Sequence, residues 1–294
     1  MLKYKKIYID TRFKTSDSKS NSDFRVEIPE SFETPDNCVF YVDDVVLPVC
    51  FGTINKYNNK VYFDIRDGGG VIREYIATLP NGNYSAVSFM NKLQTVMNAA
   101  MNGEEEIINA TVEFTYDGEK NIINMTFHDH NDPPKPLIKL FILTDGRLTN
   151  GVNFDGRTWN KNELNSINGI IQNYKLDEMY IAQNETSHSG FLDLHTTRNL
   201  YLTSSAMSNH NTCSNFNIDT IIKKIPITVG YNQMLFDNVV TPFDYLECSQ
   251  RFLKRLDFKL VDSFNRTIVL QQNFFTFSLV FGLAPAFDKW NDLE

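Results

Sequence analysis

The sequence predicts a mainly β protein: a single antiparallel jelly roll, which is a β-sandwich, with an inserted α+β domain. Three observations support this fold class. Aromatic residues make up 13% of the 294 residues, with 23 Phe and 13 Tyr, a composition that favours strands. Short stretches of alternating apolar and polar residues recur toward both ends of the chain, as is typical of half-buried strands. A clear helical period occurs in only one segment.

The strands predicted near the two ends of the chain share the same alternation of apolar and polar residues. The alternation is clearest at Leu256, Phe258 and Leu260, which are separated by charged or polar residues. The N-terminal part supplies too few strands for a stable sheet of its own. We therefore expect residues 1–57 and 190–294 to form one discontinuous jelly-roll domain. The expected strands are 5–10, 24–28, 39–49, 199–203, 220–229, 244–248, 252–261, 267–270 and 275–281.

The segment 58–189 has a different pattern and is predicted to be an inserted α+β domain. Its helix begins after Ser85, a favourable N-cap, and apolar residues then repeat at helical spacing as far as Met101. Asp117-Gly118 lies between two alternating stretches and predicts a hairpin. A second hairpin is expected at 61–79 and a further strand at 137–143, whereas the stretch from there to Gln183 is polar and poorly periodic.

The charge and the cysteines exclude several classes of protein. The net charge of -8 gives the chain no general attraction for a phosphate backbone, so no direct contact with nucleic acid is expected. Four scattered cysteines (Cys38, Cys50, Cys213 and Cys248) form no CxxC pair and are expected to be buried thiols. No run of eighteen apolar residues predicts a membrane span, and no apolar stretch near Met1 predicts a signal peptide.

Motifs that carry catalysis or bind cofactors are missing from the sequence. It has no nucleophile elbow, phosphate-binding loop or HExxH motif. We therefore expect no enzyme activity and no catalytic, cofactor-binding or metal-ligating residues. The best metal candidate is the pair His128 and His130, which two-residue spacing places on one face of a strand. His188 and His195 have no nucleophile to serve, and Asp43-Asp44 is expected to alternate to opposite faces.

Several stretches, taken in their order along the chain, resemble the minor capsid (penton) proteins of Polinton-like viruses, virophages and related double jelly-roll dsDNA viruses. The resemblance covers both ends well and residues 130–185 poorly, and Phe51-Gly52 departs from the family pattern. The segments that carry it are Ile9–Lys14 with Ser20–Phe24, Pro35–Pro48, Leu79–Tyr84, Asn199–Ser204, Ile221–Ile227 with Gly230-Tyr231, and Leu256–Asp262 through Phe275–Leu279.

The resemblance implies a structural protein of the virion. It implies a homopentamer at the five-fold vertices of an icosahedral capsid, with trimers of the major capsid protein as neighbours. The protein would be made in the host cytoplasm or in a virus factory. We expect contacts between capsomers to involve a polar arm at Thr15–Asp23 and the tail Phe287–Glu294, which contains Trp290.

Two alternatives remain open on sequence alone. The first is a jelly-roll module that binds carbohydrate or a host receptor, and it predicts an exposed aromatic platform in the inserted domain. The second is a cupin-like metalloenzyme built around His128 and His130. The first alternative is compatible with a capsid role, because a vertex domain that faces outward can also contact a receptor.

Overall fold

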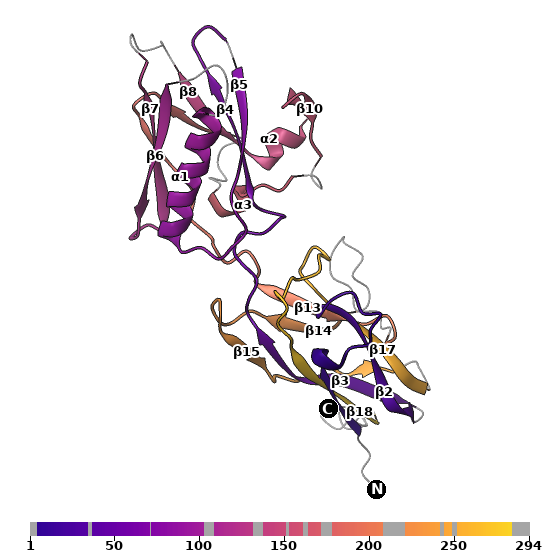
Figure 1. Cartoon of the computed structure of the whole chain (residues 1–294). Coiled ribbons are helices and arrows are strands. Elements are labelled where there is room, and N and C mark those ends of the chain that lie inside the picture. Colours follow the sequence, from indigo (N-terminus) through magenta and orange to yellow (C-terminus); the bar gives the residue numbers. More distant parts are fainter. Residues whose placement is uncertain are drawn as a thin grey trace, which may run out of the picture. The chain divides into compact units, whose positions relative to one another are not determined.

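The computed structural model describes residues 5–34, 37–70, 72–102, 109–131, 138–150, 153–160, 164–171, 178–207, 221–241, 244–248 and 252–283. The fold is mainly β, and its sheets are antiparallel. The chain divides into two compact units, unit 1 with residues 1–51 and 197–294 and unit 2 with residues 52–196. Figure 1 shows the indigo N-terminal strands and the yellow C-terminal strand in the same unit.

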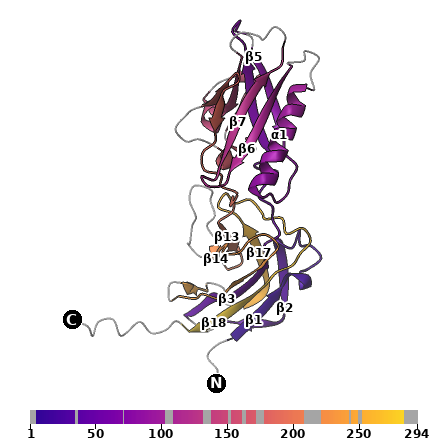
Figure 2. The ribbon, with the colours of Figure 1, turned by 90° about the vertical axis from the view of Figure 1, so that its left-hand side faces the viewer.

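Unit 1 consists of two sheets. The first has the order β1-β18-β3-β15, with the short β16 also paired to β3, and the second has the order β14-β13-β17-β2. The strands of the first sheet are β1 (Lys5–Asp10), β18 (Thr276–Leu283), β3 (Cys38–Pro48), β15 (Met234–Asp237) and β16 (Leu246–Glu247). The strands of the second are β14 (Ile221–Pro226), β13 (Asn199–Thr203), β17 (Phe252–Val261) and β2 (Asp23–Glu33); Figure 2 labels most of them.

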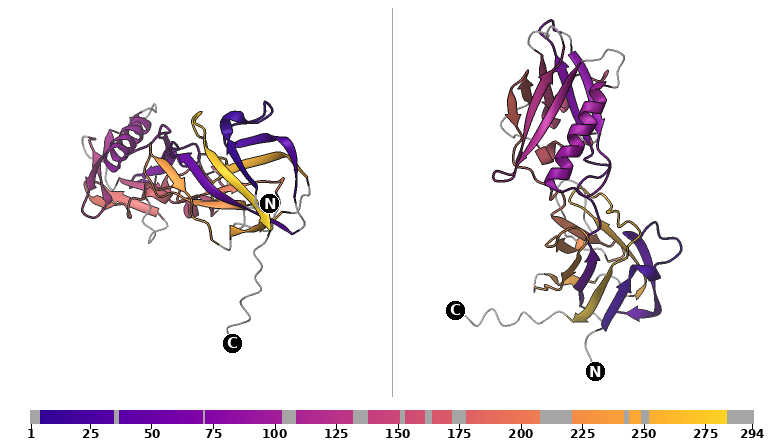
Figure 3. Two further views of the ribbon diagram at one scale, coloured as in Figure 1. Left: turned by 90° about the horizontal axis from the view of Figure 1, so that it is seen from below. Right: turned by 60° about the vertical axis from the view of Figure 1, so that its left-hand side comes forward.

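This strand order is that of a jelly roll. When the strands of the described part of unit 1 are lettered B to I along the chain, with β16 left out, the sheets read B-I-D-G and C-H-E-F. The two ends of the polypeptide pair directly, from Lys5 opposite Phe281 to Asp10 opposite Thr276. The left view of Figure 3 shows the yellow strand β18 beside the indigo N-terminal strands. The predicted single antiparallel jelly roll is confirmed.

Aromatic side chains fill the space between the two sheets. Phe24 and Phe258 lie opposite each other on β2 and β17, with ring centroids 5.6 Å apart. Phe277 comes from β18 in the other sheet, and its ring lies 4.9 Å from that of Phe258. Each of the three side chains is 1% exposed. Inward alternation in strands from both chain ends thus produces one shared core.

A buried lysine joins the two sheets at the β14 and β15 side of the sandwich. The Lys223 side chain on β14 is 5% exposed, and its Nζ donates to the carbonyl oxygen of Val239 at 2.6 Å. The same Nζ lies 3.9 Å from Oδ2 of Asp237 on β15, an oxygen that is buried and accepts no hydrogen bond from the described residues. The pair therefore holds β15 through charge rather than through a direct hydrogen bond.

Unit 2 contains two sheets, a short hairpin and three helices among its described residues. One sheet has the order β11-β8-β4-β5 and the other β12-β7-β6. The strands are β4 (Lys60–Arg66), β5 (Ile72–Thr78), β6 (Ala110–Asp117), β7 (Ile122–Asp129), β8 (Lys139–Leu143), β9 (Asn153–Phe154), β10 (Arg157–Thr158), β11 (Glu178–Ala182) and β12 (Thr186–His188). The helices are α1 (Ala86–Asn102), α2 (Asp145–Thr149) and α3 (Asn168–Ile171).

Helix α1 begins and packs as its sequence predicts. The Ser85 Oγ accepts from the Ser88 backbone N–H at 3.2 Å, and the Ser88 Oγ accepts from the Ser85 N–H at 2.8 Å, which caps the first turn. Its apolar stripe faces β5 and β6, and Figure 2 shows α1 beside β6. The buried residues of the stripe are Phe89, Met90, Leu93, Met97 and Met101.

The unit boundaries differ from the expected positions 57/58 and 189/190. The contacts divide the chain after residue 51 and after residue 196. Ile54 is 1% exposed, exchanges two backbone hydrogen bonds of 2.9 Å with Gly82, and packs in the core of unit 2, as does Leu192. A Cβ at Gly52 would lie 2.4 Å from the Gly82 carbonyl oxygen, so this close approach requires glycine.

Some of the strand predictions were wrong locally. The segment 267–270 is not a strand, because within it only Thr267 forms a bridge, to Val261. The strand β15 was not predicted, nor were β9 to β11 in the poorly periodic stretch through Gln183, nor β12 just after it. These strands contain two to five residues, and alternation cannot be recognised over so short a length.

We expect Lys223→Met to destabilise unit 1, because it leaves the Asp237 carboxylate buried without a cation. The expected loss is on the order of 3 kcal/mol, measured by chemical denaturation with a probe in unit 1. Lys224→Met is the matched control, since Lys224 is the exposed neighbour on the same strand. An equal effect of both substitutions would show that the buried pair does not stabilise the sandwich.

Candidate functional site

The exposed apolar surface lies mainly on the jelly roll. Among the described residues, fifteen large apolar side chains are exposed, and eleven of them belong to unit 1. Because isolated exposed apolar residues are ordinary, their distribution matters more than their number. The eleven are Tyr8, Phe13, Tyr231, Met234, Phe236, Val239, Phe252, Phe264, Val269, Phe274 and Leu283.

One group lies along β15, at an edge of the first sheet. Leu235 points into the core and is fully buried, so its neighbours Met234 and Phe236 point outward, with exposures of 46% and 70%. Val239 follows at 67% exposure, and its carbonyl oxygen is the one that Lys223 binds. We call residues 231–241 and 244–248 the β15 edge.

A second group lies at the opposite edge of the same sheet, along β1. Tyr8 and Phe13 are each 77% exposed. Arg12 places its guanidinium 4.4 Å from the ring centroid of Phe274 and is held by ion pairing to Asp10. Hydrogen bonds from Arg12 lower the pKa of the Asp10 carboxyl. We call residues 5–14, together with Phe274, the β1 edge.

The outer face between these edges carries a polar network that the sequence did not predict. The Lys6 Nζ lies 2.5 Å from Asp43 and 3.5 Å from Asp44, and the Ser278 hydroxyl donates to Asp44 at 2.6 Å. Asp43 and Asp44 were expected on opposite faces of the strand, which is wrong. The register of β3 against β18 shifts between Ser278 and Leu279, and such a bulge turns both carboxylates toward one lysine.

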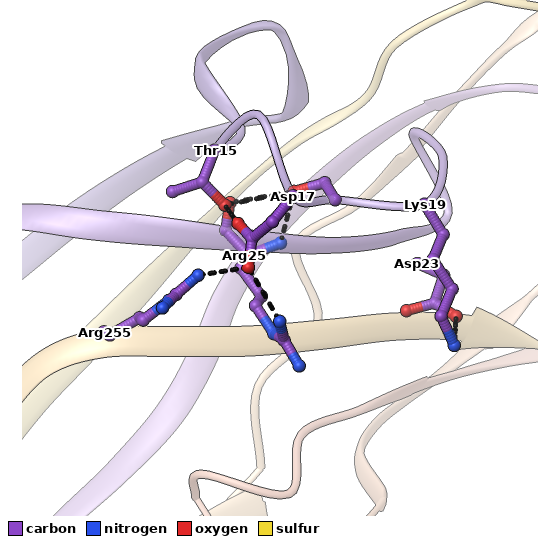
Figure 4. A network of polar contacts seen from close by, with 7 residues as sticks. Thr15, Asp17, Lys19, Asp23, Arg25 and Arg255 are labelled. Atoms are coloured by element: carbon purple, nitrogen blue, oxygen red, sulfur yellow. Dashed lines mark hydrogen bonds and ion pairs between the residues drawn. The ribbon is translucent and has the colours of Figure 1, made fainter.

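The polar segment Thr15–Asp23, whose composition predicts a loop or an extended arm, is a docked loop. The Asp17 carboxylate accepts from the Thr15 hydroxyl at 2.6 Å and from the Arg25 guanidinium at 2.8 Å, and it is also ion-paired to Arg255. Figure 4 shows these contacts converging on Asp17 from β2 and β17. The same hydrogen bonds hold the pKa of Asp17 well below its ordinary value.

Asn21 ties the other end of this loop to the segment before β18. Its side-chain amide donates to the carbonyl oxygens of Gln272 and Asn273 at 3.1 and 2.7 Å. Gln271 and Gln272 have backbone φ angles of 48° and 69°, which residues other than glycine rarely adopt. The second expected contact segment, Phe287–Glu294 with Trp290, lies outside the described residues.

The histidines considered as metal ligands have other partners. His128 and His130 stack with ring centroids 6.2 Å apart, and they lie in unit 2, outside the jelly roll. The His128 Nε2 contacts Glu113 at 3.1 Å, and the His130 Nε2 contacts Thr111 at 2.9 Å. Within the described part of the chain, no group of three or more His, Cys, Asp or Glu is placed to hold a metal ion.

The remaining candidates for chemistry form no catalytic arrangement. His188 contacts the Ser189 carbonyl oxygen through Nδ1, and Asp193 accepts from the backbone N–H of His195 rather than from its ring. Burial raises the pKa of the Cys38 thiol to about 11, so it is protonated at neutral pH. Cys213 lies outside the described residues. In the described part, no helix is long and apolar enough to span a membrane.

The β15 edge was the main feature that sequence reasoning missed. The signal was present but weak: Leu235 stands between the apolar residues Met234 and Phe236, after the turn residues Gly230 and Asn232. A run of three apolar residues does not reveal which side chains point outward. That distinction follows from the pairing of β15 with β3, opposite Val45 to Pro48.

We expect Asp17→Asn to loosen the loop from Thr15 to Asp23 without unfolding the jelly roll. Amide hydrogen exchange at Ser18 and Arg25 should become faster, by less than about tenfold, because exposed ion pairs contribute little. Asp23→Asn is the control, since the Asp23 carboxylate pairs with a Lys19 side chain that is 81% exposed. Equal exchange in both variants would show that Asp17 does not anchor the loop.

The same measurement has a predicted pH dependence. The pKa of Asp17 is lower in the folded protein than in the unfolded chain, so its contribution is complete above the ordinary Asp pKa of about 3.9. The difference between wild type and Asp17→Asn should therefore be constant at neutral pH. It should decrease only as the pH falls below about 4.

Comparison with known proteins supports the fold and gives no sequence family. No family model matches the chain, and no curated protein matches it. Among solved structures, the chain is similar to the crystal structure of the selenomethionine-labelled mavirus penton protein, with a TM-score of 0.54 and 11% sequence identity. The match covers 95% of this chain and 98% of that chain. At this identity the similarity establishes a penton-like fold, and that fold extends over nearly the whole of both chains.

Proposed function

We propose that the chain is a penton (vertex) capsid protein that forms homopentamers at the five-fold vertices of an icosahedral capsid. The observation that carries the proposal is the full-length similarity in fold to the mavirus penton protein. A jelly roll alone would be weak support, because this architecture serves many functions. The large insertion between β3 and β13 adds to this support. The structural match covers 95% of this chain, so it includes the insertion as well as the jelly roll.

The surface of the jelly roll supports a role in assembly. A ring of identical copies needs a head-to-tail interface, in which two different surfaces of one copy meet those of its neighbours. Unit 1 exposes apolar side chains at both edges of one sheet, including Tyr8 and Phe236. A stable interface buries about 800 Å² per partner, and exposed aromatic side chains are the usual centres of such interfaces.

The side-chain contacts support a structural role rather than an enzymatic one. The paired carboxylates Asp43 and Asp44 are occupied by Lys6 and Ser278, and the histidines of unit 2 contact neighbouring side chains or backbone. We accordingly propose a virion location at the capsid vertex, synthesis in the host cytoplasm or a virus factory, and trimers of the major capsid protein as neighbours. No cofactor or catalytic residue is part of the proposal.

Receptor or carbohydrate binding by unit 2 has less support. The aromatic platform that this alternative requires is small, since Tyr180 and Phe191 are the exposed aromatic side chains in the described part of unit 2. Tyr180 lies 6.0 Å from Phe141 and 5.6 Å from the Lys139 Nζ, measured from its ring centroid. This surface is the candidate for contact with a host receptor, and receptor binding is the second candidate function after the capsid role.

We expect the purified protein to assemble into pentamers of about 170 kDa, five times the mass of the 33.9 kDa chain. Native mass spectrometry gives the stoichiometry, and negative-stain images should show five-fold rings. Pentamers support the proposal. A chain that stays monomeric at its highest soluble concentration, and is also not incorporated into shells formed with the major capsid protein, contradicts it.

A further inference from the structure

We propose that neighbouring copies in the pentamer join through the two edges of one sheet, with the β1 edge of one copy against the β15 edge of the next. This inference rests on the proposed function and deepens it, because it assigns the partner of each edge as a second copy of this chain. It also assigns the ring contact to the jelly roll and not to unit 2. Three separate observations support it: the exposed apolar side chains at the edges, the charges of the two edges, and the order of the strands in the sheet.

The exposed side chains at β15 are unusual for the edge of a monomeric sheet. Soluble proteins protect edge strands with charged residues, proline or very short strands, because unpaired backbone groups promote association. The β15 strand is short, but it exposes Met234 and Phe236 on its outer face, with Val239 directly after it. Within the described residues, β15 pairs only with β3 and β1 only with β18. In the described part of the chain, each of these strands thus has one side without a paired strand, at which another chain can lie.

The charges of the two edges are complementary. Residues 5–14 contain four basic residues and one acidic residue, whereas residues 231–248 contain three acidic residues and no Lys or Arg. Some of these charges are paired within one copy, Lys6 with Asp43 and Asp237 with Lys223. With these partners and Asp44 counted, the β1 edge has a net charge of +1 (four basic and three acidic residues) and the β15 edge a net charge of -2 (one basic and three acidic residues). Contact between unlike edges is therefore favoured, and contact between like edges is opposed.

The sheet order places the two edges where a ring requires them. In the order β1-β18-β3-β15, the strands β1 and β15 are at opposite ends of one sheet. Each copy thus presents one edge to each of two neighbours, and a rotation of one fifth of a turn per copy closes the ring. An interface formed by β15 edges alone would be two-fold symmetric and would stop at a dimer.

The exposed aromatic residues allow a matched test. Phe236→Glu changes the β15 edge, Tyr8→Glu changes the β1 edge, and Phe191→Glu is the control in unit 2. Phe236 and Phe191 have nearly the same exposure, 70% and 69%, so the two substitutions disturb the fold of their units to a similar extent. Circular dichroism and thermal unfolding confirm that each variant folds, and sedimentation velocity reports the assembly state.

We expect Phe236→Glu and Tyr8→Glu each to lose the pentamer, with each contact weakened by on the order of tenfold or more, while Phe191→Glu assembles like the wild type. A mixture of the two edge variants is the sharper test. One variant retains an intact β1 edge and the other an intact β15 edge, so the mixture should form a one-to-one complex that neither variant forms alone.

The outcomes separate this inference from the proposed function. A wild-type chain that forms no pentamers, either alone or in shells formed with the major capsid protein, contradicts the function and the inference together. A wild-type pentamer that persists in Phe236→Glu as it does in Phe191→Glu contradicts the edge contact alone. Loss of assembly in Phe236→Glu with no effect of Tyr8→Glu also contradicts it, because the contact would then not join unlike edges.

Discussion

The jelly roll depends on the position of β18 between β1 and β3. The residues of β18 pair with β1 on one side and with β3 on the other. A strand from the C-terminal part of the chain therefore holds β1 and β3 in one sheet. Phe277 on the same strand contacts Phe258 in the opposite sheet. The same strand, β18, thus joins two strands within its sheet and packs against the other sheet.

This arrangement explains why the chain tolerates a large insertion. The strands β3 and β13, which flank the insertion, lie in different sheets, so their connection crosses an end of the sandwich rather than passing between paired strands. Lengthening a loop costs little conformational entropy once the loop is long. Unit 2 has a core of its own built from α1 and both of its sheets, so the insertion does not take apolar surface from the jelly roll.

Alternation predicted the long strands well, because it reports directly on burial. The bounds predicted for β1, β13 and β17 agree with the structure, and the hairpin at Asp117-Gly118 forms as predicted. Features that depend on distant partners could not be predicted. The composition of Thr15–Asp23 fits either a loop or an extended arm. It is a docked loop because Asp17 contacts Arg255, which is 238 residues away in sequence.

The functional surface was less predictable than the fold for the same reason. Whether Phe236 is a core residue or an exposed one depends on the register of β15 against β3, and the shift in β3 at Asp43 and Asp44 is invisible in the local pattern. The family resemblance predicted a ring of five copies without indicating which surfaces meet. The strand order and the charges of the two edges, read together, indicate those surfaces.

The most direct test of the account is a cryo-electron microscopy map of the assembled protein. The account predicts five copies around one axis, with Tyr8 of each copy buried against the neighbour that contributes Phe236. A ring closed through unit 2, with both edges of the jelly-roll sheet open to solvent, would contradict it.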